Sequence, residues 1–428
     1  YTSHCTDLLA LANHPIMPFS DWTDQLTAHF TLSKIAEASF GEVYRLSAHD
    51  RIPNFSRDDE SVVKIIALKP PAAITVPAHR TRCKPAPRPS TEAMSAPREV
   101  ATEVRLLQRM TAIPGYTNFR DVRVLQGRPP AALVAAFRDF NRAQRARGKE
   151  ASIFPDPGRK GGYGADQLWA VIEMQDAGAD LERCVEDGRC ADVWAVWDVF
   201  WQVVLALAKG EEAAMFEHRD LHLGNICVRG ATEARDGAVD VTRKLHFTRL
   251  EATLIDYTIS RARLSDADAD GAAGEPAIAH TDLCHPTHAG VFTGDSAEEY
   301  QYDIYRYMRG AVLHDDPYSN LAHRADGIDA WKGYKPVTNA LWLHFTLYAL
   351  LSHPNFAWPS SQPRPVARRN KAAHAAWKRA GELERVLLRL QDLLDPGVLC
   401  EPGGLGSATA VVGLALEKGW ILVDDVVG

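Results

Sequence analysis

The feature that most constrains this chain is a polar segment between two apolar ones. Residues 218–225 read His-Arg-Asp-Leu-His-Leu-Gly-Asn and lie between the apolar runs 193–208 and 226–228. Asp192, immediately before the first run, can cap a helix that extends to about residue 212. This helix is apolar on most sides, so it should be deeply buried and should deliver the chain to the polar segment.

Asp220, Asn225 and Asp256 have the order typical of protein kinases. In that class His-Arg-Asp precedes an Asn in one loop, and a second Asp follows a strand. Phosphoryl transfer requires a carboxylate that orients the attacking hydroxyl group and oxygen ligands for Mg²⁺. We therefore interpret Asp220 as the general base, and Asn225 and Asp256 as the two Mg²⁺ ligands. Arg219 should hold the neighbouring loop rather than react.

Further segments resemble one divergent kinase family, the haspins. Asp256-Tyr257-Thr258 stands where most kinases have Asp-Phe-Gly, as it does in haspins. No Ala-Pro-Glu follows, which also fits this family. The matching segments run in family order from about residue 32 to residue 350, and after the catalytic segment 216–222 they are 292–295, 300–306, 317–320 and 341–344.

The resemblance implies an α+β fold of the bilobal protein kinase type. Residues 1–177 would form a small β-rich N-lobe with an N-terminal extension and insertions near 69–97 and 138–166. Residues 178–428 would form a larger, mainly helical C-lobe. A length of 428 residues suits two lobes better than one.

The resemblance also implies a serine/threonine kinase that transfers the γ-phosphate of MgATP to a threonine near the N-terminus of histone H3. ATP and Mg²⁺ would be its cofactors, and the basic histone H3 tail its partner, with chromatin as the context. We expect a monomer in the nucleus, associated with chromosomes in mitosis. The formal net charge of −7 permits a basic partner and argues against direct nucleic-acid binding. The longest apolar stretch contains Asp198 and Gln202, so we expect it to be too short and too polar to span a membrane.

Two segments of the N-lobe should bind the nucleotide. Residues 30–45 read as strand, turn and strand, where kinases have a glycine-rich loop over the phosphates. Gly41 is present, but Ala36 and Ala38 replace the other glycines, and a positive φ would destabilise each Ala by about 1–2 kcal/mol. We therefore expect a less closely wrapped loop and weaker ATP binding. Residues 61–67 predict a strand that carries Lys64.

Lys64 should contact the α- and β-phosphates and pair with a glutamate on the helix around 102–110. Glu103 is the favoured partner, and Glu99, one turn earlier, is the alternative. By resemblance, backbone groups of 175–178 would meet adenine. The full set of expected ATP contacts is Ile35, Ala36, Glu37, Ala38, Ser39, Phe40, Gly41, Glu42, Val43, Lys64, Glu173, Gln175, Asp176, Ala177, Gly178, Asp180, Asn225, Asp256, Tyr257 and Thr258.

Asp180 and His222 are the expected substrate contacts, although a packed histidine is an equally good interpretation of His222. Thr258 replaces the glycine that lets this segment flip in other kinases. We therefore expect a fixed segment and constitutive activity. Asp303 should anchor the catalytic loop from a helix. The acidic run 266–282 would suit a basic histone tail.

Two other functions use similar residues. Small-molecule phosphotransferases, such as aminoglycoside or choline kinases, also have an Asp-Leu-His-x-Gly-Asn loop with a downstream metal-binding Asp. His218-Arg219 and Asp256-Tyr257-Thr258 argue against that class. A catalytically weak pseudokinase that serves as a binding module would explain Ala36 and Ala38, but the predicted catalytic residues are all retained.

Overall fold

The computed structural model describes residues 2–38, 41–49, 56, 59–71, 93–159, 162–230, 239–265, 277–285, 288–313, 316–318 and 329–427. The chain divides into two compact units, here called unit 1 (1–108 and 118–176) and unit 2 (109–117 and 177–428). Segment 109–117, which we had placed in the first lobe, thus belongs with the second unit. Unit 1 is rich in β-sheet and unit 2 is mainly helical, so the predicted α+β class is confirmed.

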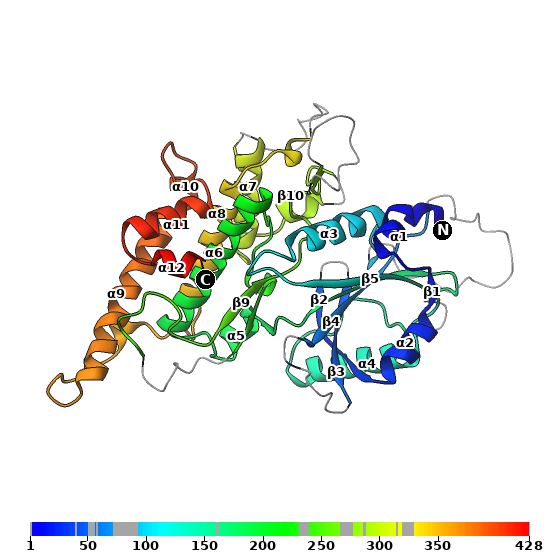
Figure 1. Cartoon of the computed structure of the whole chain (residues 1–428), viewed down its shortest axis with the longest axis horizontal. Coiled ribbons are helices and arrows are strands. Elements are labelled where there is room, and N and C mark those ends of the chain that lie inside the picture. The colour runs from blue at the N-terminus through cyan, green and yellow to red at the C-terminus, as the bar shows by residue number, and fades with distance from the viewer. Residues whose placement is uncertain are drawn as a thin grey trace. The chain divides into compact units, whose positions relative to one another are not determined.

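A six-stranded sheet with the order β1-β5-β6-β4-β3-β2 forms unit 1 (Figure 1). The β1 strand pairs with β5 in parallel, and all other neighbours are antiparallel. The central strand β4 is buried along its whole length, which explains its run of Val and Ile residues. The strands are β1 (Met17–Pro18), β2 (Phe30–Ala38), β3 (Gly41–Ala48), β4 (Ser61–Ala67), β5 (Phe119–Gln126) and β6 (Leu168–Gln175).

Helices of unit 1 are α1 (Thr6–Ala12), α2 (Phe19–Thr27), α3 (Pro97–Met110), whose last two residues belong to unit 2, and α4 (Ala131–Ala146). Apolar residues of α2, α4 and the strands form one core that includes Phe19, Leu133 and Trp169. The predicted insertion 138–166 therefore begins within α4, and its described residues after Ala146 form no helix or strand. Most of the other predicted insertion, residues 72–92, lies outside the described residues, as do Ser39, Phe40 and the acidic segment 266–276.

Unit 2 combines helices with two small sheets. One sheet has the order β7-β8-β9, from Ala179–Asp180, Ile226–Arg229 and Glu251–Leu254, and the other pairs β10 (Ala262–Arg263) with β11 (Ile278–Ala279). Strands β8 and β9 pair antiparallel, with Arg229 opposite Glu251. The helices are α5 (Leu181–Glu186), α6 (Val193–Ala214), α7 (Gln301–Leu313), α8 (Val337–Ser352), α9 (Lys371–Leu393), α10 (Pro396–Leu399), α11 (Ala408–Glu417) and α12 (Val423–Val427).

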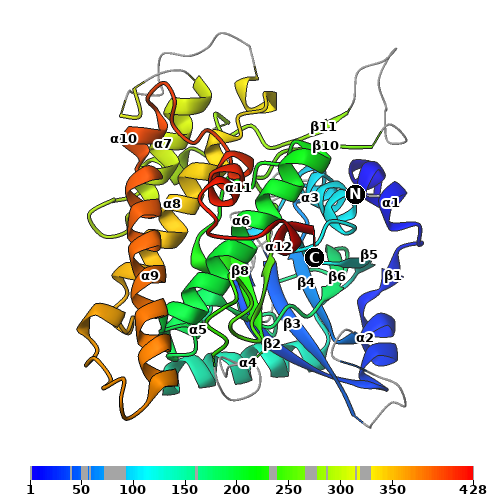
Figure 2. The same ribbon diagram turned by 60° about the vertical axis from the view of Figure 1, so that its left-hand side comes forward.

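Helix α6 is the core of unit 2, with α8, α9 and α11 packed around it (Figure 2). Its N-cap is Asp192, whose side chain accepts hydrogen bonds from the backbone of Trp194 and Ala195, both at 2.9 Å, as predicted. By length and composition alone this 22-residue helix could cross a membrane, so our expectation that the stretch is too short and too polar was wrong. Most of its apolar surface is instead buried within unit 2, as in a core helix.

Candidate active site

Asp220, the predicted base, lies on the loop between α6 and β8 and is largely buried. Tyr305 of α7 donates its hydroxyl hydrogen bond to Asp220 Oδ1. The side-chain amide of Asn225 donates to the backbone oxygen of Asp220 over 2.8 Å. Burial raises the pKa of Asp220, whereas His222 and the hydrogen bond from Tyr305 act on this pKa in the opposite direction. Tyr305 therefore holds the carboxylate, and Asn225 holds the backbone of the same residue.

His222 shapes the loop that carries Asn225. Its Nδ1 accepts a hydrogen bond from the backbone of Gly224 over 3.1 Å, which caps the short 3₁₀ helix Leu223–Asn225. Its Nε2 lies 3.9 Å from Asp220 Oδ1. His222 is thus a half-exposed capping residue next to the predicted base, a position that fits both of the roles proposed for it.

The two predicted metal ligands lie on neighbouring segments. The backbone nitrogen of Ile255 donates to the backbone oxygen of Asn225 over 3.0 Å, which continues the β8–β9 pairing up to the residue before Asp256. Asn225 uses its amide nitrogen for Asp220, so its amide oxygen is the atom that suits a cation. Together with a carboxylate of Asp256 this gives two hard oxygen ligands, and Mg²⁺ commonly takes no more than one or two from protein. The residues present therefore fit the ion.

Asp256 has a positive φ of 59°, an uncommon backbone conformation that Asp tolerates better than most residues. Its Oδ1 accepts hydrogen bonds from the backbone and the hydroxyl of Thr258. Thr281 Oγ1 donates in turn to the backbone oxygen of Thr258 over 2.9 Å. The hydroxyl group of Thr258 therefore gives the Asp256 carboxylate a contact that a glycine could not make.

Tyr257 is fully buried, and both its hydroxyl group and its ring are held by contacts. Its hydroxyl donates to the backbone oxygen of Leu254 over 2.9 Å and accepts from the backbone nitrogen of Thr117 over 3.1 Å. Its ring packs edge-on against Phe216 and His218, with centroids 5.6 and 5.9 Å away. These contacts agree with the expectation of a fixed Asp-Tyr-Thr segment.

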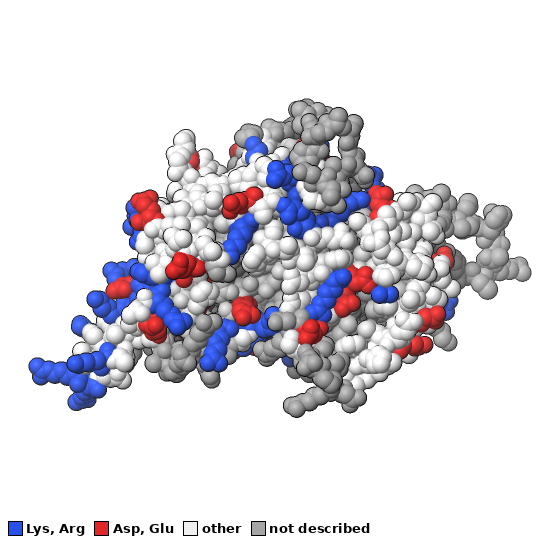
Figure 3. All heavy atoms as spheres, in the orientation of Figure 1, with Lys and Arg blue, Asp and Glu red and all other residues white. Residues whose placement is uncertain are grey.

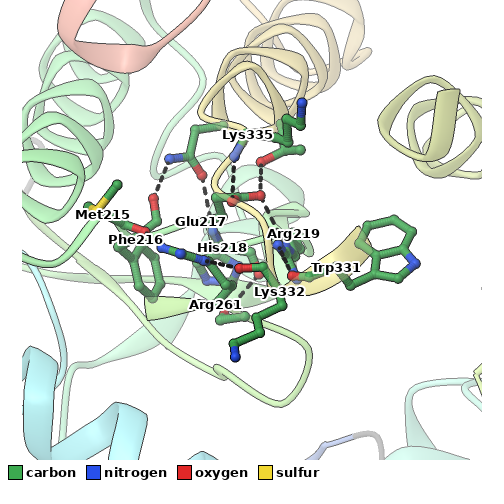
Figure 4. A network of polar contacts seen from close by, with 12 residues as sticks. Met215, Phe216, Glu217, His218, Arg219, Arg261, Trp331, Lys332 and Lys335 are labelled. Carbon is green, nitrogen blue, oxygen red and sulfur yellow. Dashed lines mark hydrogen bonds and ion pairs between the residues drawn. The ribbon is translucent and has the colours of Figure 1, made fainter. Parts of the chain in front are cut away.

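A network of buried hydrogen bonds and ion pairs surrounds the residues just before Asp220 (Figure 4). Arg219, which has a positive φ of 67° and no exposed surface, donates to Glu217 Oε2 over 3.1 Å and to the backbone oxygen of Trp331 over 2.8 Å. Glu217 also accepts from the backbone nitrogen of Lys335 over 2.7 Å. Arg261 donates to two backbone oxygens, and its own backbone pairs with that of Glu217. Arg219 thus holds the loop, as predicted.

Asn339 of α8 joins this network to helix α6 and was not expected from the sequence. Its Oδ1 accepts from the backbone nitrogen of His218 over 3.0 Å. Its Nδ2 donates to the backbone oxygen of Phe216 over 2.9 Å and to Glu211 Oε1 over 3.0 Å. One buried side chain therefore fixes two backbone groups just ahead of Asp220.

Tyr305 was also missed, and it corrects the role given to Asp303. The carboxylate of Asp303 pairs with Arg306 on its own helix, with 2.8 Å between Oδ1 and Nη1. Tyr305, two residues further along α7, is the residue that reaches the loop. A helix turns by about 200° over two residues, so the two side chains point to opposite faces of α7.

Lys64 and Glu103 meet in unit 1 as an almost fully buried ion pair, with 2.5 Å between Nζ and Oε1. Glu99, the alternative partner, instead accepts a hydrogen bond from the backbone of Ala96 over 3.0 Å at the start of α3. The structure therefore selects Glu103. A buried pair of this kind holds the lysine in one orientation, because either charge alone would be costly to bury.

The hairpin of β2 and β3 does not contain the strain that we expected. Ala36 and Ala38 lie in β2, paired with Val43 and Gly41, and neither has a positive φ. The expected free-energy penalty at these two alanines therefore does not arise. Gly41 is required for packing, since an added Cβ would lie 2.9 Å from the Ile66 side chain.

A buried lysine, Lys34, braces this hairpin. Its Nζ lies 2.6 Å from Glu37 Oε1 and 2.6 Å from Glu42 Oε2, and it donates to Ser152 Oγ over 2.9 Å. Three aromatic rings, of Phe137, Phe140 and Phe154, surround the ammonium group within 5.6 Å. The carboxylates of Glu37 and Glu42, both predicted ATP contacts, are thus bound to this lysine, which ties the hairpin to α4 and the chain that follows it.

The segments expected to meet adenine and ribose are also engaged in structural contacts. In unit 1, the backbone nitrogens of Gln175 and Asp176 donate to Asn118 and Glu60, each over 2.9 Å, and the Asp176 carboxylate pairs with Arg45. Among the other predicted ATP contacts, the Glu173 carboxylate accepts a hydrogen bond from Ser61 Oγ, and Ile35 lies at a register shift in β2. Val43 lies opposite Lys64 in the β3–β4 pair. Ala177 and Gly178 precede β7, and the Asp180 side chain caps α5 by accepting a hydrogen bond from the backbone nitrogen of Arg183. Gly178 has a φ of 99°, and a side chain there would lie 2.4 Å from the backbone oxygen of Val228.

Comparison with known families identifies the fold. The family model of the haspin-like kinase domain matches residues 2–372. This chain belongs to the haspin-like kinase family. The matched range includes the catalytic loop, the Asp-Tyr-Thr segment and the Lys64–Glu103 pair.

Individual haspins resemble the chain at moderate identity. A serine/threonine-protein kinase haspin homolog of Schizosaccharomyces pombe is 25% identical over 380 residues, which are 84% of this chain and 63% of that protein. The haspin homolog of Drosophila melanogaster is 27% identical over 74% of this chain and 48% of its own length. The haspin of Mus musculus is 26% identical over 79% of this chain and 38% of its own length. The chain thus spans about half the length of the curated relatives it matches.

Proposed function

We propose that this chain is a protein serine/threonine kinase of the haspin type, which transfers the γ-phosphate of MgATP to a threonine near the N-terminus of histone H3. The observation that carries the proposal is the arrangement of Asp220, Asn225 and Asp256 on three linked segments of unit 2. Membership of the haspin-like kinase family supports it.

Asp220 would orient the threonine hydroxyl group and accept its proton. Tyr305 holds Oδ1 of this carboxylate, so the Oδ2 side is the one proposed to face the substrate. Burial raises the pKa of Asp220 and so makes the carboxylate a better proton acceptor, while the hydrogen bond from Tyr305 favours the ionised form that must be present at the start. The two effects together suit a general base that works near neutral pH.

When bound, ATP would supply the phosphoryl group, and Mg²⁺ would supply positive charge that offsets the negative charge of the phosphate oxygens. Asn225 and Asp256 would hold the metal ion through oxygen atoms. Lys64 would contact the α- and β-phosphates, with Glu103 fixing the position of its ammonium group.

Acidic side chains next to α7 support a basic peptide as the substrate. Asp295, Glu298 and Glu299 are exposed and lie just before the helix that carries Tyr305. A cluster of this sign would attract the Lys- and Arg-bearing start of histone H3. With that substrate, we also propose a nuclear, chromosome-associated location.

The test compares Asp220→Asn with a matched control in unit 2, Asp240→Asn, which changes an exposed turn residue in the same way. The purified chain with MgATP should phosphorylate a histone H3 N-terminal peptide, and not the same peptide with its threonines replaced by alanine. Asp220→Asn should lower kcat by about 10²- to 10⁴-fold, while the control keeps its rate. Transfer to kanamycin or choline in place of the peptide would show a small-molecule phosphotransferase. Equal rates for Asp220→Asn and the parent chain would remove Asp220 as the base.

A further inference from the structure

Helix α9 and the segment before it carry a one-sided collection of positive charge. Between Asp329 and Glu382 the sequence contains no acidic residue. Seven exposed cations occur from residue 364 to residue 389, namely Arg364, Arg368, Arg369, Lys371, Lys378, Arg385 and Arg389. Figure 3 shows Lys and Arg side chains gathered at the end of α9 in that view. We call these seven residues the basic stripe.

Four members of the basic stripe lie on one line of α9. At about 100° per residue, Lys371, Lys378, Arg385 and Arg389 fall within about 40° of one another around the helix axis. The buried residues of α9, among them Leu387, lie on the opposite side. The four cations therefore point away from the core of unit 2 and extend over about 27 Å, since each residue advances the helix by about 1.5 Å.

The preceding segment is folded back against the first turns of α9. The Arg364 guanidinium lies over the ring of Trp377, 5.5 Å from its centroid. His374 stacks on the same ring and contacts the backbone oxygen of Pro365 over 3.1 Å. Asn370 caps α9 through the backbone of Ala373. These contacts make the basic stripe a defined surface of folded chain.

Little negative charge offsets the basic stripe. Within the described part of the chain, Arg368, Arg369, Lys371, Lys378 and Arg389 form no ion pair with a carboxylate. Glu382 lies on the same face of α9 but pairs with Arg379 over 3.2 Å, and Glu384 is buried against Ser360. Most protein surfaces mix both signs of charge, so an unneutralised line of this length indicates an anionic partner.

We propose that the basic stripe binds the phosphate backbone of duplex nucleic acid without reading its sequence. A duplex presents about one negative charge for each 1.7 Å of its axis, so a straight 27 Å line of cations can follow it without exact placement. Five of the seven residues are Arg, whose planar guanidinium binds phosphate with two hydrogen bonds.

Two features favour a duplex over other polyanions. Arg364 and His374 both pack against the ring of Trp377, which leaves less of that ring for stacking with the unpaired bases of a single strand. The apolar side of α9 faces the core of unit 2, and among the described residues of this helix one large apolar side chain, Leu388, is exposed. The helix therefore offers a lipid bilayer little apolar surface to bind.

This proposal replaces the expectation from net charge. A value of −7 sums over 428 residues, whereas a duplex meets only the surface that it touches. Three of the seven residues of the basic stripe, Lys378, Arg385 and Arg389, also lie beyond residue 372, where the match to the haspin-like kinase family ends. The proposed surface therefore does not follow from family membership.

The test uses two triple variants with the same change of charge. Lys378→Gln, Arg385→Gln and Arg389→Gln remove part of the basic stripe. Arg142→Gln, Arg145→Gln and Arg147→Gln remove three exposed cations at the end of α4 in unit 1. Binding to a fluorescent duplex of about 20 base pairs is measured between about 50 and 200 mM salt.

The parent chain should bind the duplex with a Kd of about 10⁻⁴ to 10⁻⁶ M at physiological salt. The stripe variant should bind at least tenfold more weakly, with a slope of log K against log salt that is smaller by about 2 to 3. The α4 variant should stay near the parent values. Both variants should phosphorylate a free peptide at the parent rate, which separates this proposal from the proposed function.

Equal losses in the two variants, or no loss in the stripe variant, would overturn the proposal. So would tighter binding to polyglutamate or to vesicles that contain phosphatidylserine than to the duplex, because the partner would then be an acidic protein or a membrane. A thermal melting curve identical to that of the parent chain shows that the stripe variant is folded.

Discussion

Replacing Asn339 by Leu tests whether one side chain of α8 holds the catalytic loop. The change keeps the number and branching of the side-chain heavy atoms and removes three hydrogen bonds, those to His218, Phe216 and Glu211. Asn339 has no exposed surface, so water cannot replace these bonds. Glu211 keeps its three other donors, the backbone nitrogens of residues 408 and 409 and the Thr409 hydroxyl group.

The expected loss of stability follows from the partners left behind. A buried backbone group without its partner destabilises a protein by about 1–3 kcal/mol, and a hydrogen bond to a charged group contributes about 1.5–3 kcal/mol. Because Glu211 keeps most of its hydrogen bonds, the loss comes mainly from the two backbone groups left without a partner. We therefore expect the free energy of unfolding to fall by about 4 kcal/mol for Asn339→Leu. Such a loss is a large part of the 5–15 kcal/mol typical of a domain. The kcat of the peptide reaction should fall with it, since His218 lies two residues before Asp220.

Urea unfolding followed by Trp fluorescence measures this change, because eight of the ten Trp residues lie in unit 2. Thr338→Val is the first control, since it removes one hydrogen bond to the Glu217 carboxylate and should lower stability by about 1.5–3 kcal/mol. Ser352→Ala is the second, because Ser352 is exposed on the same helix and its loss should change stability by less than about 0.5 kcal/mol. If Asn339→Leu were no more destabilising than Thr338→Val, the idea that Asn339 supports the loop would be refuted.

Four further outcomes are expected. Tyr305→Phe removes a hydrogen bond that lowers the pKa of Asp220, so the acid limb of the kcat profile should move to higher pH; an unchanged profile would contradict that contact. Burial lowers the pKa of His218 to about 4, whereas an unfolded histidine has a pKa of about 6.5. As pH falls from about 6.5 to 4, the unfolded chain therefore gains a proton that the folded chain does not, and unit 2 should lose about 3 kcal/mol of stability. His218→Asn should show a shallower pH dependence of stability in urea unfolding. Glu103→Gln should raise the KM for ATP and leave the KM for peptide unchanged, because it removes the charge that fixes the Lys64 ammonium group. Phosphatase treatment of the purified chain should leave its kinase activity unchanged, and a loss that ATP restores would contradict the fixed Asp-Tyr-Thr segment.

Local patterns in the sequence predicted much of the candidate site. The spacing of residues 218–225 sets the catalytic loop, because those residues share one turn and one short 3₁₀ helix. Asp192 marks the start of α6, since a cap bonds only to its immediate neighbours. Lys64 and Glu103 were found because one lies on a short β-rich strand and the other at a regular position of an amphipathic helix.

The residues that were missed act over long separations in the chain. Tyr305 lies 85 residues from Asp220, Asn339 lies 121 residues from His218, and Lys34 lies 118 residues from Ser152. No periodic pattern links such pairs, since only the packing of whole elements brings them together. Asp303 was expected to anchor the catalytic loop, yet its carboxylate pairs with the nearby Arg306.

The contact between Glu211 and the first turn of α11 bears on where the chain can be shortened. Glu211 is buried, and its carboxylate receives hydrogen bonds from residues 408 and 409, which lie well past the end of the family match at residue 372. A recombinant fragment that stopped at residue 372 would lack α11, so the Glu211 carboxylate would lose three of its hydrogen-bond donors. Fragments made for crystallisation or inhibitor screening should therefore extend at least to residue 417, or carry Glu211→Gln to limit the uncompensated charge.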